Sequence, residues 1–195
     1  FMQYKRLEDG SFEPLTNKNV DFGGGLERIA AAAIDSPDVF KISLLKPIVD
    51  KLEELSGKKY ESETESMRVI SDHLRASVFL ITDGVLPSNK EQGYVLRRLL
   101  RRSVLKAFNL GIEDDVLESI ARIIAETYAE DYPEVSRNIT STIEALKKEE
   151  KIFRQTLRKG LRELGRFSAD GLTGAEIFML YDTYGFPVEL SVEEV

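Results

Sequence analysis

The stretch PSNKEQGYVLRRLLRRSVLK, residues 87–106, predicts a helix with two opposite faces. When successive residues are placed about 100° apart around a helix axis, the apolar side chains share one half of the cylinder. They are Val95, Leu96, Leu99, Leu100 and Val104. The opposite half carries four guanidinium groups, those of Arg97, Arg98, Arg101 and Arg102. We therefore expect the apolar half to pack inward and all four arginines to point outward together.

This concentration of positive charge stands in an acidic chain, whose formal net charge is -7 over 195 residues. Residues 90–106 carry six basic side chains against one acid, and residues 151–166 do the same, whereas residues 113–134 hold eight acids against one arginine. Like charges one helical turn apart weaken an isolated helix by about 0.2–0.5 kcal/mol per pair. We therefore expect either that the acidic block folds back onto the arginines or that a polyanion binds them. Chance clustering on solvated helix faces is the alternative.

Composition excludes several classes of protein and of site. No apolar run approaches the ~20 residues that a membrane-spanning helix requires, and nothing resembles a signal peptide. We therefore expect a cytoplasmic protein with no membrane partner. The chain has no cysteine and one histidine, His73, so disulfides, cysteine-type zinc sites and thiol nucleophiles are excluded. We predict no metal site built from the chain's own residues.

The rest of the sequence predicts a mainly α protein, a helical bundle preceded by a short β-hairpin. Residues 1–15 have the pattern of two short strands joined by a turn at Glu8–Gly10. Helical spacing then dominates, most clearly over residues 66–82 and 139–167. Thr173 and Glu176 form a potential capping box for a last helix, which Gly185 and Pro187 end.

A first candidate site is VDFGGGLERIA, residues 20–30. It is neither a Walker A loop nor a dinucleotide fingerprint, because it lacks the lysine of the first and the third spaced glycine of the second. Asp21 supplies an acid, Gly23 and Gly25 allow close approach of a ligand to the backbone, and Arg28 suits a phosphate. An ordinary glycine-rich turn followed by an exposed arginine explains the same residues.

Two further candidates are polar side chains, an amide that suits a base edge and a carboxylate that suits a ligand donor. Arginines hold phosphates without reading sequence, whereas reading requires groups that can bond to base edges. Asn89 lies in the turn before the arginine helix, and Asp182 lies in LYDTYGFPVEL, residues 180–190. Asn89 as a plain turn residue, and Asp182 as a carboxylate bonded to its own backbone, are the alternatives.

Four segments, taken in order, resemble the alanyl-tRNA synthetase family. They are VDFGGGLERIAA (20–31), RVISDHLRASVFLITDGVLPSN (68–89), GYVLRRLLRR (93–102) and LYDTYGFPVEL (180–190), so the resemblance covers nearly the whole chain. It implies that residues 1–34 form the end of a class II α+β catalytic domain, including motif 3. It also implies that residues 35–195 form a helical domain that recognises the tRNA acceptor stem.

The resemblance also implies roles for individual residues. Arg28 matches the motif 3 arginine that contacts ATP phosphate, Gly23 and Gly25 match glycines beside the nucleotide, and Asp21 matches the acid near the amino group of alanine. Phe22 and Gly24 depart from the threonine and methionine usual in the family. Asn89 and Asp182 match the residues that read a G·U wobble pair, and the arginine face would hold the RNA backbone.

The implied reaction joins alanine to tRNA(Ala) through alanyl-adenylate, with ATP and Mg²⁺ as cofactors. Motifs 1 and 2 and a zinc-bearing editing domain lie outside the sequence, so we expect this chain alone to hold no cofactor and to form no adenylate. A non-catalytic RNA-binding helical module, or a bundle that binds an acidic protein partner, are the alternative functions.

Overall fold

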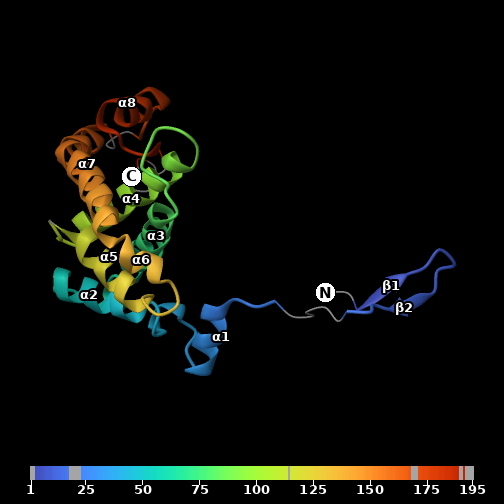
Figure 1. Cartoon of the computed structure of the whole chain (residues 1–195). Coiled ribbons are helices and arrows are strands. Elements are labelled where there is room, and N and C mark those ends of the chain that lie inside the picture. Colours follow the sequence, from blue (N-terminus) through green and yellow to red (C-terminus); the bar gives the residue numbers. More distant parts are fainter. Residues whose placement is uncertain (1–2, 18–22, 114, 168–170, 189–190, 192–195) are drawn as a thin grey trace. The chain divides into compact units, whose positions relative to one another are not determined.

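The computed structural model describes residues 3–17, 23–113, 115–167, 171–188 and 191. The chain divides into two compact units, Phe1–Ser43 and Leu44–Val195. Helices dominate the described residues, with one short two-stranded sheet (Figure 1). The predicted mainly α fold with a hairpin near its start is therefore confirmed.

The first unit contains the hairpin and one helix. Strands β1 (Tyr4–Arg6) and β2 (Phe12–Pro14) pair antiparallel, with Tyr4 opposite Pro14. Gly10 takes φ +84° in the predicted turn, a conformation that favours glycine. Helix α1 (Leu26–Ala33) begins directly after Gly25, and a short 3-10 helix, η1 (Val39–Lys41), follows it.

The second unit is a bundle that contains most of the buried apolar side chains. Its elements are α2 (Lys46–Ser56), η2 (Tyr60–Ser62), α3 (Thr64–Thr82), α4 (Glu91–Asn109), α5 (Val116–Thr127), α6 (Pro133–Arg137), α7 (Ile139–Phe167) and α8 (Gly174–Tyr184). The helices predicted at 66–82 and 139–167 are α3 and α7. Helix α4 packs along α3 and also against α7, and α8 packs on α7. Figure 1 shows α8 and α2 at opposite ends of this unit.

The predicted inward face of α4 is confirmed in its centre and wrong at its edge. Leu96, Leu100 and Val104 are buried, at 1% exposure or less. Val95 is 44% exposed, although it was placed on the buried face. The reason is geometric: Val95 lies about 100° around the axis from Leu96, so it falls outside the arc that α3 and α7 cover.

Candidate nucleic-acid interface

A cavity of about 380 Å³ lies between the start of α4 and the end of α8. We call it the interface pocket. Five of the six residues predicted to contact nucleic acid line it, namely Asn89, Arg97, Arg98, Arg101 and Asp182. Tyr94 and Tyr181 also line it. Segments far apart in the sequence are thus brought together around one opening.

The loop that carries Asn89 folds back on the first turn of α4. The Ser88 backbone N–H donates to the Gly93 carbonyl oxygen at 3.0 Å. A Cβ at Gly93 would overlap Ser88 Oγ and lie within 2.5 Å of the Leu86 carbonyl oxygen, so glycine is required for this approach. Asn89 itself is exposed, and its Oδ1 accepts a hydrogen bond from Arg97 Nη1.

The expectation that all four arginines of α4 point outward is wrong. The side chains of Arg97 and Arg101 are only 23% and 15% exposed, and both pair with Glu149 of α7, which is 4% exposed. Arg101 Nε donates to Glu149 Oε1 at 2.8 Å, and Arg97 Nε lies 3.3 Å from the same oxygen. A carboxylate between two guanidinium groups one turn apart offsets their mutual repulsion.

In the described part of the chain, Arg97 and Arg101 pair with Glu149 of α7 and not with the acidic block at 113–134, so the expected fold-back of that block is not observed for these two arginines. Acids of this block pair with basic side chains of α7. Arg158 lies 3.3 Å from Glu113, and Lys147 Nζ lies 2.6 Å from Glu118. Acids of the block therefore offset the charge of Lys147 and Arg158 on α7.

Arg101 also ties α4 to the end of α8. Its Nη1 donates to the Gly185 carbonyl oxygen at 2.6 Å, and its guanidinium lies over the Phe153 ring, 5.3 Å from the centroid. Gly185 ends α8 in a left-handed conformation, φ +65°, and a Cβ there would overlap Arg101 Nη1. Glycine thus serves both the helix end and the close approach of Arg101.

The remaining predicted contacts occupy different surroundings. Arg98 is exposed at the pocket, whereas Arg102 is half-buried and does not line it. Asp182 is exposed on the last turns of α8, and no hydrogen bond or ion pair joins its carboxylate to another described residue. Local bonding of Asp182 is therefore not observed in the described part of the chain, and its oxygens face the pocket as acceptors.

Helix α8, which carries Asp182, begins at a capping box and packs against α7 at its end. The predicted capping box is present at its start, where Thr173 Oγ1 accepts from the Glu176 backbone N–H. At its end, Thr156 Oγ1 donates to the Tyr184 carbonyl oxygen at 2.8 Å. A Cβ at Gly160 would lie 3.1 Å from the Phe186 ring, so the glycine in α7 allows this close packing.

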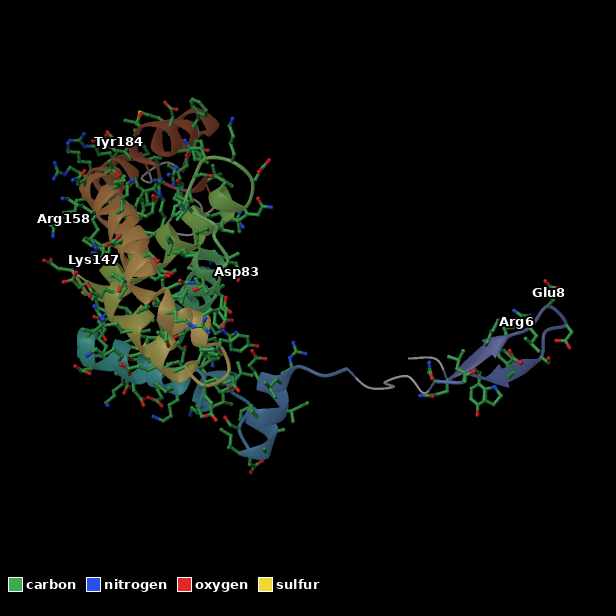
Figure 2. All side chains as sticks on the ribbon, viewed as in Figure 1. Arg6, Glu8, Asp83, Lys147, Arg158 and Tyr184 are labelled. Carbon is green, nitrogen blue, oxygen red and sulfur yellow. The ribbon has the colours of Figure 1, made fainter. Side chains whose placement is uncertain are left out.

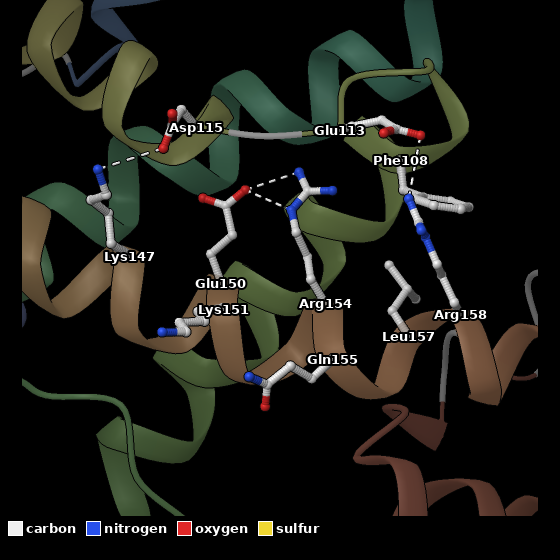
Figure 3. Close-up of a pocket in the computed structure, with 10 residues that line it drawn as sticks. All are labelled: Phe108, Glu113, Asp115, Lys147, Glu150, Lys151, Arg154, Gln155, Leu157 and Arg158. Carbon is white, nitrogen blue, oxygen red and sulfur yellow. Dashed lines mark hydrogen bonds and ion pairs between the residues drawn. The ribbon is translucent and has the colours of Figure 1, made fainter.

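A second cavity, of about 500 Å³, is lined by α7 and by residues between the end of α4 and the start of α5 (Figure 3). Most of its charged side chains pair with one another. Glu150 lies 2.9 Å from Arg154, and Lys147 lies 3.5 Å from Asp115. Burial raises the pKa of the Glu150 carboxyl, and the nearby Arg154 offsets this only in part. Figure 2 shows Lys147 and Arg158 projecting from α7 at this side. These charges are largely satisfied within the chain.

The glycine-rich candidate site is described only in part. Asp21 and Phe22 lie outside the described residues. Gly23, Gly25 and Arg28 are exposed at the start of α1, where backbone N–H groups and a guanidinium suit a phosphate oxygen. Among the described residues, no group of three or more metal-ligating side chains is arranged to hold an ion. The helices described here include none long and apolar enough to cross a bilayer.

Glu149 is the residue of this site that the sequence analysis missed. The sequence did contain an indication of it. Ile143, Leu146, Phe153 and Leu157 form the buried stripe of α7, and Glu149 falls on that stripe. A carboxylate at a core position requires a cationic partner, and the arginines of α4 were the available candidates.

Comparisons with known proteins match one family over the whole chain. The family model described as tRNA synthetases class II (A) matches residues 1–195. The alanine–tRNA ligase of Pediococcus pentosaceus is 41% identical over 203 residues, and that of Desulfitobacterium hafniense is 42% identical over 203 residues. The alanine–tRNA ligase of Hydrogenovibrio crunogenus is 40% identical over 197 residues. Each alignment covers 99% of this chain and 23% of the relative, so the chain spans about a quarter of their length.

Proposed function

Because the chain belongs to the alanine family of class II tRNA synthetases, we propose that it binds the acceptor stem of tRNA(Ala) and recognises a G·U wobble pair there. Asn89 and Asp182 bond to the wobble pair, and the exposed Arg98 contacts the phosphates of the RNA backbone. The observation that carries this proposal is the meeting of Asn89 and Asp182 at one pocket, although Asn89 lies in the loop before α4 and Asp182 lies on α8.

The chemistry of a wobble pair fits these two side chains. In a G·U pair the exocyclic amino group of guanine has no base partner, so it is a donor exposed in the minor groove. The minor groove of an RNA helix is wide and shallow, and it admits side chains. An amide oxygen and a carboxylate can both accept from that amino group. Asp182 brings two acceptor oxygens, and Asn89 Oδ1 has a second lone pair beyond the one that Arg97 uses.

The four arginines of α4 have different roles in this proposal. Arg98 is exposed at the pocket and is the residue best placed to contact phosphate oxygens. Arg97 and Arg101 share the charge of Glu149, so they contribute less positive potential to a passing backbone than their number suggests. Arg102 does not line the interface pocket, so it contacts the RNA backbone only at the edge of the bound stem.

The parent enzyme, in this proposal, activates alanine with ATP and transfers it to the 3′ end of the tRNA in the cytoplasm. Residues 1–34 contribute the end of its catalytic domain. Arg28 binds a phosphate oxygen of ATP, Gly23 and Gly25 leave room for the nucleotide, and Asp21 holds the amino group of alanine. Mg²⁺ arrives with ATP and stabilises phosphate charge. A zinc site belongs to an editing domain outside these residues.

Substitution of Asn89 tests the base-reading role. Asn89→Ala should reduce the preference for a G·U over a G·C minihelix by about 1–3 kcal/mol, because an acceptor for the guanine amino group is lost. Arg98→Ala is the matched comparison. It should weaken binding of both stems alike. It should also make the negative slope of log K against log salt shallower by about 1, because one phosphate contact is lost. Fluorescence titration of both minihelices at two salt concentrations measures both effects.

Three results of this titration would contradict the proposal. One is an Asn89→Ala chain that still distinguishes the two stems as well as the unmodified chain does. Another is a minihelix affinity that does not fall with salt, since phosphate contacts release counterions. The third is a chain that binds an acidic peptide better than either minihelix.

A further inference from the structure

We propose that Glu149 is a positioning residue that sets the discrimination between G·U and G·C pairs without contacting RNA. This inference rests on the proposed function and adds a specificity-determining residue to it. Glu149 lies on α7, a helix that carries neither Asn89 nor Asp182. Its carboxylate connects the two segments that carry them.

A continuous series of contacts joins the two base-reading side chains through Glu149. Asn89 Oδ1 accepts from Arg97, and Arg97 pairs with Glu149. Glu149 accepts from Arg101 at 2.8 Å, and Arg101 donates to the Gly185 carbonyl oxygen at 2.6 Å. Gly185 is the residue that ends α8, the helix whose last turns carry Asp182.

Burial makes this series rigid. Glu149 is 4% exposed, so its interactions with both guanidinium groups are weakly screened by water and by salt. Arg101 is also held over the Phe153 ring, which restricts its side chain further. An exposed carboxylate can move and exchange its partners for water. The buried Glu149 carboxylate cannot, so a movement of its side chain must displace Arg97 or Arg101.

The contact with Arg97 decides which atom of the Asn89 amide faces the pocket. Arginine has only donors, so it selects the amide oxygen and fixes the side-chain orientation. If Arg97 is released from Glu149, the amide is free to rotate and present its NH₂ group. That group is a donor and cannot bond to the guanine amino group. Discrimination then falls, although Asn89 is still present.

The same change has an opposite effect on general RNA affinity. Without the carboxylate, Arg97 and Arg101 carry two uncompensated positive charges one turn apart. They become available to phosphate oxygens. Loss of Glu149 charge should therefore preserve or strengthen binding of any stem, and steepen its salt dependence, while the preference for G·U decreases. A residue needed only for folding would weaken both stems instead.

The test uses Glu149→Gln in the 195-residue chain, with G·U and G·C minihelices at two salt concentrations. We expect the G·U preference to fall by about tenfold, which lies within the range for loss of one base-reading contact. The affinity for the G·C stem should be unchanged or higher. The slope of log K against log salt should become more negative, by about 1 for each arginine that gains a phosphate.

Glu150→Gln is the matched control. Glu150 is the next residue of α7 and is equally buried, but it pairs with Arg154 at the second cavity (Figure 3). This variant should leave both the G·U preference and the salt slope unchanged. If Glu150→Gln lowers the G·U preference as much as Glu149→Gln does, the loss is a general effect of removing a negative charge from α7. That result would overturn the specific role of Glu149.

The outcomes separate this inference from the proposed function. An unmodified chain with no G·U preference contradicts the proposed function itself. An unmodified chain that prefers G·U, together with a Glu149→Gln chain that keeps the same preference, overturns only the role of Glu149. Equal weakening of both stems by Glu149→Gln also overturns it. Should Glu149→Gln fail to fold, Glu149→Asp keeps the charge but shortens the side chain, and an unchanged preference in that variant overturns it.

Discussion

At the scale of single residues, burial determines what each arginine of α4 can do. Arg98 and Arg101 are three positions apart on one helix, yet Arg98 is exposed and Arg101 is only 15% exposed. Arg101 donates hydrogen bonds to Glu149 of α7 and to the Gly185 carbonyl oxygen at the end of α8. Removing it would leave a buried carboxylate without its hydrogen-bonded partner, which costs about 3–5 kcal/mol for a buried pair. Arg101 is therefore primarily a structural residue.

Glu150 gives a prediction for the pH dependence of stability. Burial raises the pKa of its carboxyl above the ordinary value of 4.5, so the folded chain holds this proton more tightly than the unfolded chain. The contribution of Glu150 to stability is thus fully present below pH 4.5 and is lost as pH rises through the folded pKa. Glu150→Gln removes this dependence. The difference in unfolding free energy, variant minus unmodified chain, should increase as pH rises above 4.5.

Glu118→Gln provides the control for this experiment because the sign is reversed. Hydrogen bonds from Lys147 and Arg122 lower the pKa of Glu118, so its contribution is lost as pH falls. The same difference should therefore decrease as pH rises toward 4.5. Urea unfolding at pH values below and above 4.5 gives the difference in unfolding free energy for both variants. If this difference changed with pH in the same direction for Glu118→Gln and Glu150→Gln, the two carboxylates would not lie in opposite environments.

At the scale of elements, the contact between the Asn89 loop and α4 depends on Gly93. Gly93→Ala would place a Cβ against Ser88 Oγ and the Leu86 carbonyl oxygen, so the loop must shift. We expect a loss of about 1–3 kcal/mol of stability from this overpacking. The G·U preference should fall as well, because Asn89 is carried by the displaced loop. Urea unfolding and the minihelix titration measure the two effects.

Gly165→Ala is the matched helical control. Outside the backbone of its own helix, a Cβ at Gly165 meets no atom of the described residues within 4 Å, and Gly165 lies inside α7. Alanine there should raise stability by about 0.5–1 kcal/mol, since it restricts the unfolded chain and favours helix. If both glycine variants changed stability in the same direction, steric contact at Gly93 would not be the reason for its glycine.

Sequence patterns predicted the elements of this fold better than the partners of their side chains. The bounds of α7 and the capping box of α8 followed from local spacing and from Thr173 and Glu176. Periodicity also identified the buried centre of α4. It could not identify Glu149 as the partner of Arg101, because that pair depends on how α4 and α7 cross. The proximity of Asn89 to Asp182 had the same origin, and only family resemblance suggested it.

At the scale of the molecule, folding brings basic and acidic segments that are separate in the sequence next to each other. In the basic second half of α7, Arg158 pairs with Glu113 of the acidic block. Among the described residues of α4, Arg97 and Arg101 pair with the buried Glu149, and Lys106 pairs with Glu65. Arg98 is exposed at the interface pocket. A net charge of -7 therefore does not prevent a local site for a polyanion.

The division into two units leads to a prediction about the origin of stability. Among the described residues, Ala31 and Ile42 are the buried apolar side chains before Leu44, whereas the second unit contains all the others. Apolar burial supplies most of the favourable free energy of folding. A chain of residues 44–195 should therefore unfold cooperatively with nearly the thermal midpoint of the 195-residue chain. It should also bind the G·U minihelix with the same affinity, because Asn89, Glu149 and Asp182 all lie within it. Calorimetry and titration of the two chains check this, and a lower midpoint or weaker binding in the shorter chain would show that the second unit depends on the first.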